Sequence, residues 1–521
     1  MGLPKETHTN NEWRLFAEDA LALARKGGAT YADVRIHPEE KSQDITVEGD
    51  REEDGRVVSV STGVTSGFGV RVLCDGAWGF FATDDLDKKH LERIVARALA
   101  SARANAKIRK SPLEILPLRE DERGQEYFYE SPFKIDPFAV SLEDKKNLLL
   151  AADRVMRDGG KRVFKRSGYL SAYRFRKILS TTDGVFADQT FTRVGASINA
   201  LAERSRNDDD RQSCSYPSKH PVVMQQGWEA IVDFDLVKHA ARIAEEADRF
   251  LDAPETPSGM RDIILMPEQN NLHATHETVH GAEGDRVDNN EWSLAGGSLF
   301  SLVLGQIGSF PFGSDAVNIV ADSLTSGGVG TYACDDEGVP AKRTILVENG
   351  IWKGLLVSRE CAPSLNKEIG REYFTEASGA MRASGYSKLP LIRMNNISLL
   401  PGQMSYEEML DRAPIGTIRF ANNTSWSIDP YRRDFLFGTE LGWEKVLRDG
   451  RAVWEPRRNP VYRGDNLKQF FRNCVAVSDT PELYGIGSCG KGTPVQVMAT
   501  GHSTPPTWFK NIRVDSARAR S

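Results

Sequence analysis

The stretch DIILMPEQNNLHATHETVHG, residues 262–281, combines two patterns of different period. Residues 262–266 form a compact apolar run that predicts a strand. Asn270 or Asn271 can then cap the start of a helix, and Gly281 can supply the left-handed residue at its end. We therefore expect a strand that leads into a helix over about 270–281.

Three of the nine histidines, His273, His276 and His280, fall on this expected helix. His276 and His280 are four residues apart, which places them on one face about 6 Å apart along the axis. Two imidazoles in that position can share one zinc ion at bond lengths of about 2.0–2.1 Å. Glu277 follows the first of them, where the H-E-x-x-H motif of metalloproteases places its general base. The pattern predicts His276 and His280 as metal ligands and Glu277 as the catalytic base.

His273 lies on the same face, but it is separated from His280 by seven residues, or about 10 Å of helical rise. One ion cannot bind both side chains, so we expect His273 to support the ligands from behind or to lie on the surface. The competing interpretation of the whole motif is a solvent-facing helix whose histidines have no function.

A catalytic zinc needs a third protein ligand and one open position. The candidates are Glu283, which follows the helix, and the remote Cys489. Cys489 lies in the glycine-rich segment 485–492, which we expect to form a turn. This segment matches a dinucleotide fingerprint and nearly matches a phosphate-binding loop, but both motifs need a helix directly afterwards. Residues 493–497 predict a strand, so we reject both nucleotide-binding interpretations.

The rest of the chain alternates expected helices with short strands. Helices are expected at residues 11–28, 85–105, 141–159 and 227–251, and strands at 33–36, 44–48, 68–73, 78–82, 169–179 and 190–201. Asn349-Gly350 and Asp449-Gly450 are typical of two-residue hairpin turns, because both residue types tolerate a positive φ.

The predicted fold class is α+β, with an N-terminal α/β region of helices and short strands. A mostly antiparallel β region carrying the H-E-x-x-H helix follows it. We expect three domains: an N-terminal α/β subdomain at 1–125, a second at 126–255, and a strand-rich metallopeptidase domain at 256–521.

Composition restricts the class of protein. The chain has 521 residues and a formal net charge of −6, which argues against a dedicated nucleic-acid binder. No apolar run approaches the roughly 18–20 residues of a membrane helix, so no membrane span is expected. The polar N-terminus has no signal-peptide core, which favours a cytoplasmic location. The six cysteines are scattered, so we expect no disulfide framework.

An ordered set of short motifs resembles the TldD/PmbA family of zinc metallopeptidases, once described as modulators of DNA gyrase. The motifs are Tyr31-Ala-Asp-Val-Arg35, Gly67-Phe-Gly-Val-Arg-Val72, Ala77-Trp-Gly-Phe80, Asp262-Ile-Ile-Leu265, Glu283-Gly-Asp285, Asp335-Asp-Glu-Gly338, Glu348-Asn-Gly350, Lys353-Gly354, Arg393-Met-Asn395 and Cys489-Gly-Lys491. Single pieces are weak evidence, but the ordered set is specific and runs over nearly the whole chain.

The resemblance implies that His276 and His280 are the histidine ligands, Glu277 the catalytic glutamate and Cys489 the cysteine ligand. All four residues are retained, as in the metal-bearing TldD type. The PmbA (TldE) type lacks the metal residues, and the two types can associate. The implied assembly is a homodimer, or a heterodimer with a TldE/PmbA-like chain.

In one respect the sequence departs from the family. The family spacing is H-E-x-x-x-H, and this motif is one residue shorter. At family spacing Thr275 would take the first ligand position, where a hydroxyl cannot replace an imidazole, so we keep the shorter assignment.

The resulting hypothesis is zinc-dependent hydrolysis of peptide bonds in unfolded peptides or small flexible proteins. The alternative is a non-catalytic, PmbA/TldE-like partner subunit of a protease complex. The group that would stabilise the negative charge formed during hydrolysis is not identified. His502 and Tyr386 are candidates, although a structural role explains each of them better.

Overall fold

The computed structural model describes residues 7–206, 210–288, 297–466 and 469–517. Its first half contains α1 (Thr7–Lys26), β1 (Tyr31–Asp50), β2 (Arg56–Cys74), β3 (Ala77–Thr83), η1 (Lys88–His90), α2 (Leu91–Ala106), η2 (Glu120–Glu122), β4 (Glu126–Glu130), α3 (Leu142–Gly159), β5 (Val163–Thr181), β6 (Phe186–Glu203), β7 (Arg211–Tyr216), β8 (Val222–Met224), α4 (Glu229–Phe234) and α5 (Leu236–Phe250).

The second half is richer in strands. It contains β9 (Gly259–Leu265), α6 (Pro267–Asn270), η3 (Asn271–Glu277), α7 (Thr278–His280), α8 (Gly284–Val287), η4 (Leu299–Gln306), β10 (Ile319–Asp322), β11 (Arg343–Glu348), β12 (Ile351–Trp352), α9 (Cys361–Ile369), β13 (Met381–Arg382), β14 (Leu391–Ile392), β15 (Asn396–Leu399), α10 (Tyr406–Arg412), β16 (Ile418–Ile428), β17 (Asp434–Arg448), β18 (Arg451–Arg457), β19 (Pro460–Asp465), η5 (Phe471–Asn473), β20 (Cys474–Val477), β21 (Glu482–Lys491), β22 (Gln496–Thr504) and β23 (Thr507–Ser516). The predicted α+β class with a strand-rich C-terminal half is confirmed.

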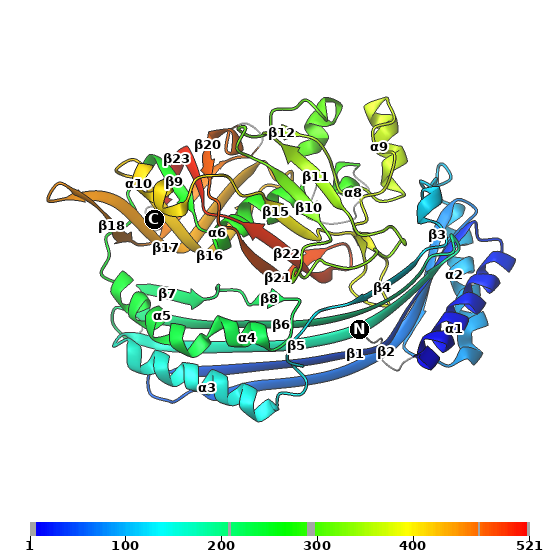
Figure 1. Cartoon of the computed structure of the whole chain (residues 1–521), viewed down its shortest axis with the longest axis horizontal. Helices are drawn as coiled ribbons and strands as arrows, with labels where there is room; N and C mark the ends of the chain where they lie inside the picture. The colour runs from blue at the N-terminus through cyan, green and yellow to red at the C-terminus, as the bar shows by residue number, and fades with distance from the viewer. Residues whose placement is uncertain (1–6, 207–209, 289–296, 467–468, 518–521) are drawn as a thin grey trace.

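Four long, curved strands, β1, β2, β5 and β6, form the base of the molecule (Figure 1). Helices α3, α4 and α5 cover the outer face of this sheet, and the C-terminal half sits over its inner face (Figure 1). Side chains alternate between the two faces of a strand. On β5, Leu170 and Ala172 therefore join the core under the helices, whereas Tyr173 and Phe175 point toward the C-terminal half.

The expected short strands at 33–36 and 44–48 are parts of one strand, β1, which has 20 residues. A shift in register between His37 and Glu40 separates the two parts. Pro38 lies in this interval, and proline cannot donate to the ladder, so strands accommodate it at a bulge. The gap between the two expected strands is therefore a bulge within β1, and the pairing of β1 with β2 and β5 continues beyond it.

One expected helix is divided and another begins as predicted. The helix predicted at 227–251 is split into α4 and α5, because Asp235 adopts a left-handed conformation with φ of 46°. Aspartate is one of the few non-glycine residues that tolerate this conformation. The helix predicted at 141–159 is confirmed as α3, and the Ser141 hydroxyl caps its start by accepting a hydrogen bond from the Asp144 N–H.

One continuous sheet joins the two halves of the chain. Its strand order is β12-β11-β10-β15-β22-β21-β8-β6-β5-β1-β2-β3, with β4 and β7 pairing to β6. The junction is the pairing of Ile486 in β21 with Val222 in β8. Strands from all three expected domains, 1–125, 126–255 and 256–521, therefore belong to this sheet.

A second sheet closes on itself. Strand β9 pairs with β16 and β23, β19 joins β23 to β17, and β17 returns to β16. The result is a five-stranded barrel, from which β18 extends as a hairpin arm (Figure 1). Both predicted hairpin turns are present, with positive φ at Asn349 and Gly350 and at Asp449 and Gly450. The histidine segment leaves the barrel directly after β9 and runs toward the large sheet.

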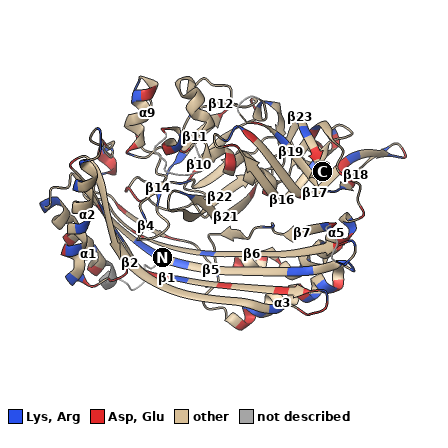
Figure 2. Ribbon diagram, turned by 180° about the vertical axis from the view of Figure 1, so that it is seen from behind, with Lys and Arg blue, Asp and Glu red and all other residues tan. Residues whose placement is uncertain are grey.

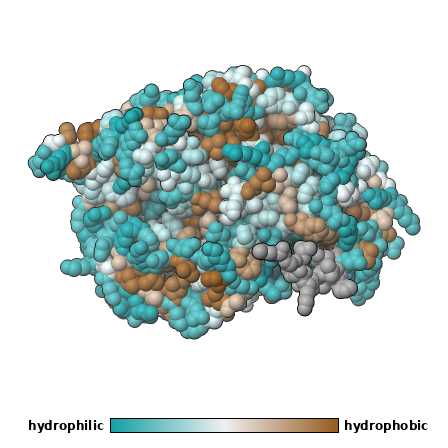
Figure 3. All heavy atoms as spheres, viewed as in Figure 1, coloured by the Kyte–Doolittle hydropathy of each residue, from teal (hydrophilic) through white to brown (hydrophobic). Residues whose placement is uncertain are grey.

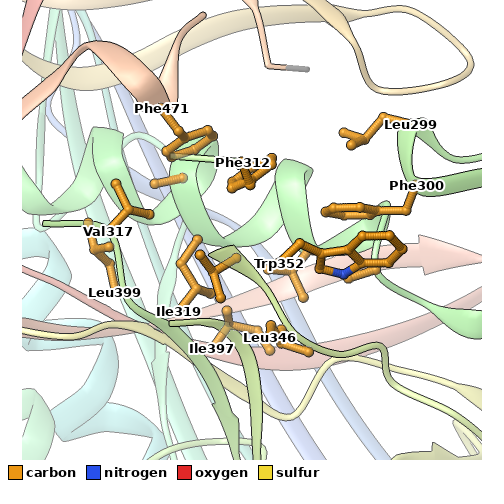
Figure 4. Close-up of a cluster of buried hydrophobic side chains, with 14 of the residues drawn as sticks. Leu299, Phe300, Phe312, Val317, Ile319, Leu346, Trp352, Ile397, Leu399 and Phe471 are labelled. Carbon is orange, nitrogen blue, oxygen red and sulfur yellow. The ribbon is translucent and has the colours of Figure 1, made fainter. Parts of the chain in front are cut away.

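The C-terminal half has its own hydrophobic core between the two sheets (Figure 4). Phe300 stacks on Trp352 with ring centroids 4.5 Å apart, and Phe312 stacks on Phe471 at 4.9 Å. Such aromatic pairs stabilise a core beyond the area they bury. This core fixes β10, β11 and β15 beside β22, one of the strands at the site described below.

Charged and hydrophilic side chains are prominent on the outer helices and on the face shown in Figure 3. Basic and acidic residues are interspersed on the outer helices α1, α2 and α3 (Figure 2). Hydrophilic side chains dominate the face shown in Figure 3, and apolar ones appear there in scattered patches. Within the described residues, no helix has the length and apolar character needed to cross a membrane.

Candidate metal centre

The histidine segment is a helix, but it differs from the expected one. It begins at Pro267, not at Asn270 or Asn271, and proline suits this first position because its missing N–H has no partner there. Gly281 has φ of −67°, so it does not form the expected left-handed end. The predicted strand before the helix is confirmed as β9.

The middle of this helix, η3, is wound as a π-helix. The His273 carbonyl, five residues back, accepts hydrogen bonds from both the N–H and the hydroxyl of Thr278. The Thr275 hydroxyl donates to the Asn271 carbonyl at 2.6 Å. Such π-turns concentrate at functional sites. Here the widened turn carries His276 and Glu277, and His280 follows in α7.

Three side chains with metal-ligating atoms converge at this point. Ligand atoms of His276, His280 and Cys489 all lie within 4.8 Å of one another, and all three residues are buried. The His280 Nε2 atom is 3.1 Å from the Cys489 sulfur, and the two imidazole ring centroids are 4.8 Å apart. The fold therefore brings the sequence-predicted trio together across more than 200 residues. A solvent-facing helix with incidental histidines is wrong, because the segment is buried.

Glu283 holds His280 from behind. Its Oε2 atom lies 2.9 Å from His280 Nδ1, 3.0 Å from Arg286 Nε and 3.3 Å from Lys491 Nζ. Burial opposes ionisation, but Lys491, His280 and Arg286 hold the pKa of Glu283 well below its usual value. An anionic partner on Nδ1 fixes the imidazole orientation and leaves Nε2 directed at the Cys489 sulfur.

Cys489 lies on strand β21 and not in the expected turn. It pairs with Met498 of β22, and a register shift between Ile486 and Cys489 marks a bulge next to it. Burial raises the pKa of the Cys489 thiol, but the charge of His280 and its hydrogen bond, together with Arg393, outweigh burial and lower it to about 7. The residues after the β21–β22 turn form a strand, so no helix N-terminus is available for a nucleotide phosphate.

His276 is held by a third histidine, His502 of β22, whose Nε2 atom lies 3.0 Å from His276 Nδ1. Burial, followed by the charges of His276 and His280, lowers the pKa of His502 well below its usual value. A neutral His502 can take part in a single hydrogen bond with His276 and leave the other imidazole nitrogen of His276 available.

His273 is fully buried in an aromatic cluster. Its Nδ1 atom lies 3.1 Å from the Tyr462 hydroxyl and its Nε2 atom 3.2 Å from the Asn466 amide oxygen. Its ring stacks on Phe437 with centroids 4.4 Å apart. Because both ring nitrogens are engaged, His273 joins the helix to the barrel interior and does not lie on the surface.

Two cavities that share lining residues adjoin the site. The first, which we call the site cavity, has a volume of about 400 Å³ and is lined by His276, Glu277, His280, Cys489 and Arg432 among others. A narrower side cavity of about 90 Å³ is lined by His276, Glu277 and Glu268. Glu277 thus faces both spaces next to the three converging side chains, a position from which a carboxylate could act as a general base.

Sequence reasoning missed Arg432 and the contact of His502 with His276. Arg432 has φ of 57° in the loop after β16, a loop position with no recognisable motif. Its charge adds to burial in lowering the pKa of His276. Tyr386, the other candidate donor, lies against His37 with ring centroids 6.0 Å apart and does not line the site cavity.

Comparison with known proteins identifies relatives along most of the chain. A metalloprotease of Methanocaldococcus jannaschii is 28% identical over 461 residues, which cover 88% of this chain and 92% of the relative. A metalloprotease TldD homolog of Buchnera aphidicola is 26% identical and covers 84% of each chain. A zinc metalloprotease TldD homolog of Saccharolobus solfataricus is 24% identical and covers 95% of this chain and 98% of the relative.

Two crystal structures share the fold. A candidate modulator of a DNA gyrase from Thermotoga maritima superimposes with a TM-score of 0.69 at 18% identity, covering 96% of this chain and all of that one. TldE from Thermococcus kodakarensis gives a TM-score of 0.64 at 15% identity, covering 96% of this chain and 99% of that one.

Family models account for most of the chain in three successive pieces. Residues 38–102 match domain 1 of the PmbA/TldA metallopeptidases, residues 135–251 match the central domain, and residues 260–516 match the C-terminal domain. The buried His276, His280 and Cys489 all fall within the last match. The chain therefore belongs to the PmbA/TldA metallopeptidase family.

Proposed function

We propose that this chain is a zinc-dependent peptidase that hydrolyses peptide bonds in unfolded peptides or small flexible proteins. The observation that carries the proposal is the convergence of His276, His280 and Cys489 within 4.8 Å beside the buried Glu277. Relatives named metalloprotease support a peptidase, and one of them is named as a zinc enzyme.

The donor set suits zinc. Two imidazoles and a thiolate are ligands that Zn²⁺ prefers, and three protein ligands leave the open position of a catalytic site. Two ligands of one zinc ion lie no further apart than the sum of their bond lengths, about 4.1–4.4 Å. Atoms within 4.8 Å of one another need only small side-chain rotations to meet that limit.

When bound, Zn²⁺ supplies a Lewis acid that lowers the pKa of water and polarises the scissile carbonyl. Glu277 accepts the proton that water loses as it attacks, and delivers it to the leaving nitrogen. Arg432 lines the same cavity. We propose that its positive charge stabilises the negative charge that develops on the carbonyl oxygen. Glu283 and His502 keep the two imidazoles in place during these steps.

The substrate is proposed to bind as an extended strand. Among the described residues, β21 pairs on one side with β22 before and after the bulge at 487–488, but on the other side it pairs with β8 only at Ile486. The backbone from Gly487 to Lys491 therefore presents an edge beside Cys489, and such an edge can pair with a peptide of almost any sequence. An unfolded segment is free to adopt this extended pairing, which favours unfolded substrates.

The complete set of proposed ligands and base favours the metal-bearing TldD type over the non-catalytic partner type. We propose that the chain forms a homodimer or a heterodimer with a TldE/PmbA-like chain, in line with the shared fold of TldE. A cytoplasmic location is part of the same proposal. All six cysteines are free and buried, as a reducing compartment permits.

Metal removal tests the proposal directly. The purified protein is expected to hold about one zinc per chain and to cleave an unfolded peptide. Dialysis against a chelator should abolish cleavage, and Zn²⁺ but not Mg²⁺ should restore it, because thiolate and imidazole ligands discriminate against hard cations. Zinc is quantified by mass spectrometry and cleavage by chromatography. Protein that binds no stoichiometric zinc even after reconstitution would support the non-catalytic subunit.

Glu283→Gln tests how the ligands are held. Glutamine can still accept a hydrogen bond from His280, but it lacks the charge, so zinc affinity should fall about 10-fold. Competition with a chromogenic chelator measures the affinity. Asp285→Asn is the matched control, because Asp285 also pairs with Lys491, at 2.7 Å, and has no contact with His280 among those described. A loss of zinc affinity in Asp285→Asn but not in Glu283→Gln would contradict the role of Glu283.

A further inference from the structure

A third cavity, of about 430 Å³, lies between the inner face of β1, β5 and β6 and the C-terminal half. We call it the sheet cavity. Ser488, next to Cys489, lines the sheet cavity, the side cavity and the site cavity alike. A peptide whose scissile bond lies at the proposed zinc site would thus extend into the sheet cavity within a few residues, at about 3.3 Å per residue.

Two arginines line the sheet cavity without an ion-pair partner among the described residues. The Arg193 guanidinium donates to the Gln225 side chain at 3.2 Å and to the Val329 carbonyl at 3.1 Å. Arg382 donates to the carbonyls of Met394, Val329 and Ala499. Their recorded hydrogen-bond acceptors are all neutral, and the two guanidiniums share the Val329 carbonyl.

The two charges disfavour each other in this buried place. Burial and the neighbouring Arg382 lower the pKa of Arg193 to about 10. Burial and the neighbouring Arg393 lower the pKa of Arg382, while Tyr332, Asp336 and Cys489 oppose the shift. Buried charges are costly unless paired, so an anion that enters this cavity would gain strong, charge-assisted hydrogen bonds.

The carboxylates that line the cavity accept hydrogen bonds from groups other than the two arginines. Asp336 binds Lys177 at 2.8 Å and accepts the Ala383 N–H. Asp335 accepts three backbone N–H groups, those of Glu337, Val339 and Met381. Asp44 accepts the Tyr169 hydroxyl. Among the described residues, none of these three carboxylates forms an ion pair with Arg193 or Arg382, so the two guanidiniums have no anionic partner in contact.

We propose that Arg193 and Arg382 bind a carboxylate of the peptide substrate, either its C-terminal carboxylate or an acidic side chain near the scissile bond. Arginine forks match carboxylate geometry, and the aromatic walls Phe175 and Phe191, over which Arg193 is placed, accommodate the adjoining apolar part. The inference rests on the proposed peptidase function and specifies which peptides it prefers.

The test uses four versions of one unfolded peptide: free C-terminus without acidic residues, the same peptide amidated, and the amidated peptide with one Glu or one Gln. Affinity is measured by fluorescence anisotropy with Glu277→Gln protein, so that binding is scored without hydrolysis, and kcat/KM is measured with the active enzyme. Peptides with a carboxylate should bind more tightly than neutral ones. The first pair isolates the C-terminal carboxylate and the second pair the side chain.

Arg193→Gln, introduced with and without Glu277→Gln, is expected to weaken binding and lower kcat/KM by about 10- to 100-fold for carboxylate peptides. It should change values for neutral peptides by less than about 3-fold. Arg193→Lys should restore part of the difference, because it keeps the charge but loses the fork. Arg174→Gln is the matched control, since Arg174 lies on the opposite face of the same sheet, paired with Asp136. Thermal unfolding checks that each variant is folded.

Equal affinities and rates for all four peptides with the wild-type site would overturn the inference and leave the peptidase function standing. An unchanged preference in Arg193→Gln would overturn it as well. If no peptide is hydrolysed, the proposed function fails, and the anisotropy measurements still decide whether the arginines bind a carboxylate.

Discussion

Glu277→Gln is expected to lower kcat for unfolded peptides by about 10²- to 10⁴-fold while zinc content stays at the wild-type level. Glutamine has nearly the same shape as glutamate, but its amide cannot take a proton from water at neutral pH. The side chain adjoins His276 in sequence and lines the site cavity, yet it is not one of the three converging ligands. The substitution should therefore slow hydrolysis without weakening zinc binding. Peptide cleavage gives kcat, and mass spectrometry gives the zinc content.

Glu268 is the strongest competitor for the role of base, and it provides the informative comparison. Burial raises its pKa to about 7, a value suited to a general base at neutral pH. However, one of its oxygens accepts the Asn422 N–H, and it lines the side cavity without reaching the site cavity. If Glu268→Gln silences hydrolysis and Glu277→Gln does not, the base is Glu268 and the assignment of Glu277 is wrong.

The features predicted correctly from the sequence depend on residues close together in the chain. Asn349-Gly350 and Asp449-Gly450 set hairpin turns by their own backbone preferences, and Ser141 caps α3 through its own hydroxyl. The strand before the histidines is a short apolar run. None of these features needs information about distant segments.

The predictions that were wrong concern backbone conformations and strand pairings that the local apolar pattern does not show. The split at Asp235 replaces a helical residue by a left-handed one, although the apolar period continues through it. The single long strand β1 exists because β2 and β5 pair across the bulge at Pro38. Closure of the barrel through β16 and β17 involves strands far from β9 in sequence, and no local pattern records such pairings.

The candidate site shows the same division. The spacing of His276, Glu277 and His280 could be recognised in the sequence because one helix carries all three. Distance along an ideal helix separates His273 from the predicted ligands, but it does not reveal that Tyr462 and Asn466 bind both of its ring nitrogens. The π-helical winding was equally hidden, since it depends on a hydrogen bond across five residues that α-helical geometry does not anticipate.

Cys489→Ser is expected to reduce zinc affinity by more than about 100-fold, beyond the usual effect of changing a residue behind the ligands. A serine hydroxyl stays protonated at neutral pH and does not replace a thiolate as a ligand. Hydrolysis should fall with zinc occupancy and recover in part when excess Zn²⁺ is added, because His276, His280 and Glu277 remain. Zinc content after dialysis and kcat at increasing Zn²⁺ concentrations give the two readouts.

The matched control is Cys214→Ser, which removes another buried thiol. Cys214 lies on β7 in the core under the helices, and its sulfur contacts Glu246 at 3.4 Å. This variant should lose some stability but retain stoichiometric zinc. Full zinc occupancy in Cys489→Ser would show that the two histidines need a different third ligand, and Glu283, which contacts His280 at 2.9 Å, would be the first residue to test. Loss confined to Cys489→Ser would instead establish that β21 completes the site, next to β22, whose His502 contacts His276.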